Sequence, residues 1–194
     1  MANISSAFNS YHIFQGPAVV YLGPSGATPS EIGGVFNVGI EVGMETERLE
    51  QGWPRILQQI YVKRKSAKVS FDSCETGDYP LVRYALGSAT LVSATLGGGE
   101  QQHELYYGGQ TTLNTCSIKL LIVNTENVTE EVSIWKALAS DGYGKNYDDE
   151  ATHKPTYQFE VMRVTQDWAS NNMETYHGEL MKMVITGNNI DATI

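Results

Sequence analysis

The sequence predicts a mainly β protein, built either as two packed sheets or as an open barrel, with one short helix packed against it. Apolar and polar side chains alternate with a period of two over several segments, as half-buried strands require. Glycine-rich turn signals separate many of these segments. A chain of 194 residues, 41% of them hydrophobic, can build one domain of this kind, which we expect to span residues 1–194.

Three strands are expected before the helix, after a loose N-terminal segment at residues 1–16. Residues 17–22 form a short apolar run that ends at a Gly-Pro-Ser-Gly turn signal. Residues 34–47 and 66–73 alternate strongly, which predicts two half-buried strands. The apolar faces of these two strands consist of Val38, Ile40, Val42 and Met44 in the first and Ala67, Val69 and Phe71 in the second.

The best helix candidate covers residues 75–87. Pro80 suits the first turn of a helix, and Gly87 suits a left-handed C-terminal stop. Leu81, Tyr84 and Ala85 form one apolar stripe, so this short helix should depend on packing against a sheet.

Strand signals dominate the second half of the chain. Residues 131–139 fit a strand through their apolar residues, but their alanine-rich end would suit a helix equally well. Residues 141–155 are polar and predict an exposed loop. Further strands are expected at residues 91–96, 102–107, 117–124, 156–164 and 179–186.

The connection between the two long strands is the most informative part of the sequence. Residues 48–65 are far more than the roughly two to five residues of an ordinary hairpin loop. They are also too apolar to remain in water, so we expect an extended arm that docks on something outside its own subunit. The apolar residues of this segment are Trp53, Ile56, Leu57, Ile60, Tyr61 and Val62.

Charge is distributed unevenly along the chain. Residues 48–68 hold six basic side chains and one acid, a net charge of +5, while the remainder holds seven basic and 21 acidic side chains, a net charge of −14. A basic arm on an acidic body can attract a second copy head to tail. A solvated basic loop or a nucleic-acid contact is the alternative, but the apolar residues of the arm favour a protein surface.

No catalytic or metal-binding constellation stands out, so neither an enzyme nor a cofactor is expected. The acidic loop at residues 141–150 could bind calcium weakly, but it lacks the ligand order of an EF-hand. Residues 97–99 are three glycines without the lysine that a phosphate loop needs. No second ligand-type residue lies at metal-binding spacing from the four histidines, which are His12, His103, His153 and His177.

The cysteines and the hydrophobicity profile predict a soluble protein made in the cytoplasm. Cys74 and Cys116 are too few for a disulfide framework, and we expect both to be buried free thiols. No apolar run approaches the length of about 20 residues that crosses a bilayer, and no secretory signal is present at the N-terminus.

The order of these elements resembles that of tailed-bacteriophage tail tube proteins, also called major tail proteins. The resemblance covers roughly residues 17–186 and depends on architecture rather than on a chemical motif. The matching elements are a short strand at residues 18–22, a long alternating strand at 35–47, an arm that contains Trp53 and Pro54, a return strand that begins with Lys65-Ser-Ala-Lys68, a helix at 79–86 and a β-rich second half.

The resemblance implies two orthogonally packed sheets, a flanking helix and a structural virion protein of the phage tail. Six subunits would close a ring, and rings would stack into a hollow tube through which DNA passes without specific binding. The implied partners are other copies of the chain and the tape-measure, initiator and terminator proteins of the tail, with no membrane involved. Such a protein is made in the host cytoplasm.

Two groups of site residues follow from this interpretation. The arm would contact the next ring, with apolar anchors and basic side chains that set the register. The acids of the long strand would line the lumen and repel DNA phosphates. The expected arm contacts are Arg48, Trp53, Pro54, Arg55, Ile56, Leu57, Tyr61, Lys63 and Arg64, and the expected lumen-lining residues are Glu41, Glu45 and Glu47.

Two other functions remain open at this point. A tail completion or head–tail joining protein would form a closed ring but no long tube. A β-sandwich that binds carbohydrates or peptides would use aromatic side chains for stacking. The aromatic residues expected for that role are Tyr143, Tyr147 and Tyr157.

Overall fold

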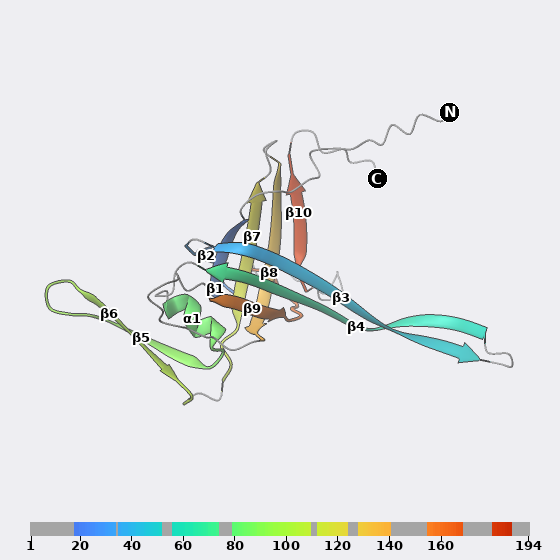
Figure 1. Ribbon diagram of the computed structural model, residues 1–194, viewed down its shortest axis with the longest axis horizontal. Coiled ribbons are helices and arrows are strands. Elements are labelled where there is room, and N and C mark those ends of the chain that lie inside the picture. Colours follow the sequence, from blue (N-terminus) through green and yellow to red (C-terminus); the bar gives the residue numbers. More distant parts are fainter. Residues whose placement is uncertain are drawn as a thin grey trace, which may run out of the picture.

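A computed structural model confirms a mainly β protein with one short helix (Figure 1). It describes residues 18–33, 35–51, 56–73, 79–109, 112–123, 128–140, 155–168 and 180–187. The elements are β1 (Ala18–Pro24), β2 (Ser30–Glu31), β3 (Val35–Gln51), β4 (Ile56–Ser73), α1 (Tyr79–Ala85), β5 (Ala89–Thr95), β6 (Gln101–Tyr107), β7 (Cys116–Val123), β8 (Thr129–Ala139), β9 (Thr156–Val161) and β10 (Lys182–Thr186).

The described strands form two antiparallel sheets, neither of which closes into a barrel. The larger sheet has eight strands in the order β2-β1-β7-β8-β9-β4-β3, with β10 paired to β8. β1 and β3 contact each other although they lie near opposite ends of this order, so the sheet folds back on itself. In Figure 1, β3 and β4 cross the strands β1, β7 and β8 at a steep angle. The second sheet is the hairpin of β5 and β6.

The core lies between the two halves of the folded sheet. Buried side chains of β1, β4, β7, β8, β9 and α1 form one cluster. At its centre the ring of Phe71 stacks on the rings of Tyr157 and Phe159, with centroids 5.5 and 5.9 Å apart. The side of β4 that the alternation predicts to be apolar is thus the side that faces the core.

The helix agrees with its prediction where the structure describes it. It covers Tyr79–Ala85, and residues 74–78 lie outside the described residues. Gly87 has a φ of 67°, a conformation that glycine adopts without steric cost, and its N–H donates to the carbonyl of Tyr84. Leu81, Tyr84 and Ala85 pack into the core cluster, as their spacing predicts.

Two details of the strands could not be predicted from the alternation pattern alone. The ambiguous segment at residues 131–139 is strand β8, which pairs with β7, β9 and β10. The short strand β2 pairs with β1 and had no sequence signal.

The structure also bears on the predictions for the cysteines and for one loop. Cys116 is a buried free thiol, as predicted. Cys74 and residues 141–154 of the predicted loop lie outside the described residues.

Candidate assembly surface on the hairpin arm

The predicted arm is the outer part of one long hairpin. β3 and β4 pair from Val35–Ser73 out to Gln51–Ile56, so residues 48–51 and 56–65 continue the two strands rather than forming a separate connection. β9 pairs with β4 only along residues 68–72. Beyond that point, residues 42–51 and 56–67 form a two-stranded ribbon, here called the outer arm, which projects from the body (Figure 1).

The outer arm has one apolar face, which continues the core-facing side of β3 and β4. The register places Val42 opposite Ala67, Met44 opposite Lys65 and Arg48 opposite Ile60. None of the described segments of the body covers this face, and its five large apolar side chains are between 46% and 65% exposed. These side chains, here called the apolar face, are Val42, Met44, Leu57, Ile60 and Val62.

A β-bulge at Lys63 determines which side chains of β4 reach the apolar face. Glu45 pairs with Arg64 and the next residue, Thr46, pairs with Val62, so Lys63 is the extra residue. In an unbroken register, Lys63 would lie opposite Thr46 on the apolar face, and Val62 would point to the other side. A second register shift, between Leu49 and Glu50, has the same effect on Leu57.

The opposite face of the outer arm carries charges of both signs. Glu41 pairs across the strands with Lys68, and Glu45 pairs with Arg64. The Lys63 ammonium lies 3.7 Å from the Glu45 carboxylate. Both side chains of the Lys63–Glu45 ion pair are more than half exposed, so this pair contributes about 0–1 kcal/mol. The net charge of the segment is therefore partly neutralised by acids on the neighbouring strand.

The expected lumen-lining residues share that charged face. Glu41, Glu45 and Glu47 are exposed and lie on one side of β3. The same side also presents Lys68 and Arg64, and the Arg64 guanidinium donates to the Glu160 carboxylate at 3.1 Å. The face is therefore mixed in charge rather than lined by carboxylates alone.

The expected arm contacts do not share one face of the arm. Arg48 and Leu57 lie on the apolar face, whereas Tyr61 and Arg64 lie on the charged face, with Lys63 at the bulge. Ile56 belongs to β4, and its side chain is not described. The residues outside the described part of the chain are Trp53, Pro54 and Arg55.

Four members of the apolar face are not among the expected arm contacts, although Ile60 and Val62 were recognised as apolar residues of the arm. Val42 and Met44 were recognisable, because their alternation with Glu41 and Glu45 assigns them to one side of a strand. The positions of Ile60 and Val62 depend on the bulge, which has no signal in the sequence.

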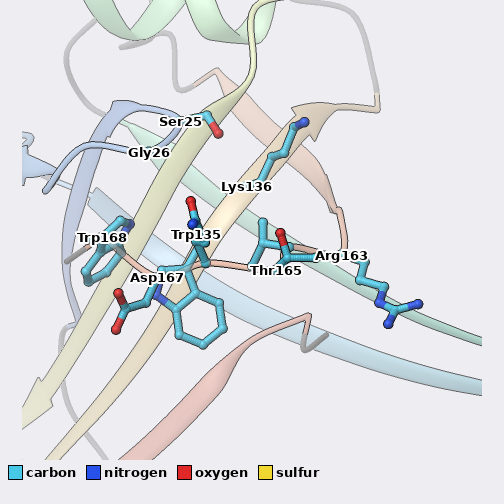
Figure 2. A pocket seen from close by; sticks show the side chains of 10 residues that line it. Ser25, Gly26, Trp135, Lys136, Arg163, Thr165, Asp167 and Trp168 are labelled. Atoms are coloured by element: carbon cyan, nitrogen blue, oxygen red, sulfur yellow. The ribbon is translucent and has the colours of Figure 1, made fainter. Parts of the chain in front are cut away.

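A second candidate site is a cavity of about 340 Å³ on the outer side of β8. Trp135, Trp168 and Asp167 line it together with Lys136 and Arg163, and Figure 2 shows the Arg163 side chain pointing away from the two indoles. Trp135 is only 4% exposed, so it offers little ring surface on which a sugar could stack.

The aromatic residues expected for sugar binding do not form a site in the described chain. The expectation for Tyr157 is wrong, because its side chain is 1% exposed and stacks on Phe71 in the core. Tyr143 and Tyr147 lie outside the described residues.

Metal and membrane chemistry gain no support from the part of the chain that the structure describes. No group of three or more histidine, cysteine, aspartate or glutamate side chains there is placed to hold a metal ion. No helix in the described ranges has the length and apolar character to cross a membrane.

Comparison with known proteins does not assign a family. No protein-family model matches the chain, and a search of curated proteins finds no match to it.

Proposed function

We propose that this protein is a structural subunit that assembles with copies of itself into stacked rings, and that these rings form a hollow tail tube for the passage of DNA. The observation that carries the proposal is the uncovered apolar face on a long projecting hairpin. Large apolar side chains that cluster on a projecting element mark an interaction site. A partner must cover Val42, Met44 and Ile60 if their exposure is to have a function.

The free edges of the sheet support assembly of identical subunits. β3 is the last strand in the order of the large sheet, and its outer edge pairs with no strand in the described part of the chain. A long unpaired edge is a risk of uncontrolled aggregation unless another chain covers it. Repeated head-to-tail contacts between identical subunits close into rings or continue as filaments. Both features suit a subunit whose neighbours complete its sheet.

The charge of the whole chain supports passage of DNA without binding. The net charge of −9 disfavours a phosphate-binding surface. In this proposal Glu41, Glu45 and Glu47 face the lumen together with Lys68 and Arg64, so the wall repels DNA weakly. The repulsion from the remaining acids of the chain keeps the duplex from adhering.

Two neighbouring substitutions test the assembly surface directly. Ile60→Lys places a charge on the apolar face, whereas Gln59→Lys places the same charge on the opposite face one residue away. Both side chains are exposed, so both variants should fold. We expect Ile60→Lys to abolish sedimentable assemblies, because an ammonium group cannot be buried in the contact without a partner. Gln59→Lys should assemble as the unmodified protein does, and equal assembly of the two variants would contradict the proposal.

A further inference from the structure

The hairpin of β5 and β6 is a second projecting element with an exposed apolar face. It forms its own two-stranded sheet and lies at the opposite end of the molecule from the outer arm (Figure 1). Register pairs Thr90 with Tyr106 and Val92 with Glu104, so these four side chains share one face. Val92 is 45% exposed and Tyr106 is 58% exposed. This surface is here called the Tyr106 face.

The Tyr106 face is acidic and ordered. The chain contains no lysine or arginine between Tyr84 and Ile118, whereas Glu100 and Glu104 belong to this stretch. The Glu104 carboxylate accepts hydrogen bonds from the Gln102 amide at 2.7 Å and from the Tyr106 hydroxyl at 2.5 Å. The carboxylate is therefore held beside the exposed Val92 and Tyr106 side chains.

The apolar face of the outer arm is complementary to this surface. Arg48 and Lys65 lie on the same side of the arm as Ile60 and Met44, and Glu50 is the one acid that pairs on that side. An apolar strip with two cations thus matches an apolar strip with a fixed carboxylate. The Tyr106 face and the apolar face of one copy cannot bind each other, because the hairpin and the arm lie at opposite ends of the molecule (Figure 1).

We propose that the Tyr106 face is the surface on which the outer arm of a second copy docks, with the apolar face of that arm against Val92 and Tyr106 and its Arg48 or Lys65 paired with Glu104. The inference rests on the proposed function, for which it names the receiving surface. Each copy then donates an arm at one end and receives an arm at the other. Because the two surfaces differ, a pair of copies still has one free arm and one free receiving surface. Further copies can therefore add, as an open-ended stack requires.

Reciprocal charge reversal tests the pairing in the full chain. Glu104→Lys alone, and Arg48→Glu with Lys65→Glu, should each raise the concentration needed for assembly by about tenfold or more, because each leaves like charges in contact. The three substitutions together should recover most of the loss. Gln101→Lys adds a lysine on the opposite face of the same hairpin, beside Thr95, and is the matched control that should have little effect. No recovery in the combined variant would overturn the pairing.

Site-directed cross-linking separates this inference from the proposed function. One batch carries Ile60→Cys and another carries Val92→Cys, both with Cys74→Ser, and a short bis-maleimide is added to the mixed assemblies. A cross-linked dimer in the mixture, absent from each batch alone, is the expected result. A third batch carries Ile185→Cys on β10 as an alternative docking position. If the assemblies form but Ile60→Cys cross-links to Ile185→Cys instead of Val92→Cys, the inference is overturned and the tube proposal still stands. Failure of the unmodified chain to assemble would overturn both.

Discussion

The side chain of Phe71 is one of the largest in the core between the two halves of the folded sheet. It is fully buried and stacks on Tyr157 and Phe159, which belong to the neighbouring strand β9. Phe71→Ala should therefore lower the free energy of unfolding by about 3–5 kcal/mol, because it removes a buried ring and leaves a cavity. Urea unfolding followed by circular dichroism measures the change. Val42→Ala, on the exposed apolar face, should change the unfolding free energy by less than about 0.5 kcal/mol, and a similar loss in both variants would contradict this assignment.

The buried thiol of Cys116 should make the protein less stable as the pH rises in the alkaline range. Burial raises the pKa of its thiol from 9.0 to about 12, and the thiol donates to the carbonyl of Ala137. The folded protein therefore keeps a proton that the unfolded chain loses as the pH rises above 9. Stability should fall between pH 9 and about 12, by up to about 1.4 kcal/mol per pH unit from this group.

The comparison with Cys116→Ala isolates this contribution. Burial also raises the pKa of Tyr84, which acts in the same direction, so the unmodified protein alone does not separate the two groups. Urea unfolding at several pH values should give a shallower alkaline slope for Cys116→Ala. Identical slopes for the two proteins would show that the thiol is not shielded in the folded state.

At the scale of elements, the bulge at Lys63 keeps the apolar side chains of the arm on one side. Deleting Lys63 removes the bulge but preserves the pairing of Glu45 with Arg64 and of Thr46 with Val62. Inserting one alanine between Glu45 and Thr46 also removes the bulge, but it turns the distal ribbon over because the side-chain period is two. The insertion should abolish assembly, whereas the deletion should retain it, as followed by sedimentation. Loss in both variants would mean that the bend of the bulge matters, rather than the facing of the side chains.

The strands were largely predictable from alternation, but alternation does not predict which parts of a strand are covered. Alternation in β3 and in β4 assigns side chains to faces, but it does not say whether a face is covered. Val69 and Met44 follow the same pattern, yet Val69 is buried in the core cluster and Met44 is 63% exposed, because the body packs on the inner part of the hairpin and not on the outer arm. The strand form of residues 131–139 depends on pairing with three other strands, which are distant in sequence.

At the scale of the whole molecule, the sequence indicates an arm but not the surface that it uses. The composition of residues 48–68 marks a projecting, basic and apolar segment. Acids of β3 and Glu160 of β9 lie beside the basic side chains and partly neutralise their charge. The arm and the β5–β6 hairpin lie at opposite ends of the molecule (Figure 1). This placement is a property of the whole fold, so it cannot be predicted from local sequence patterns.

Electron microscopy of the purified full chain, concentrated at moderate salt, tests whether the molecule is a tube subunit. Hollow filaments with a regular axial repeat are expected for the unmodified protein. The variant that lacks residues 49–64 should give none, because it lacks most of the outer arm. Discrete rings that never stack, or single subunits at every concentration, would contradict the proposal that this chain builds a tube.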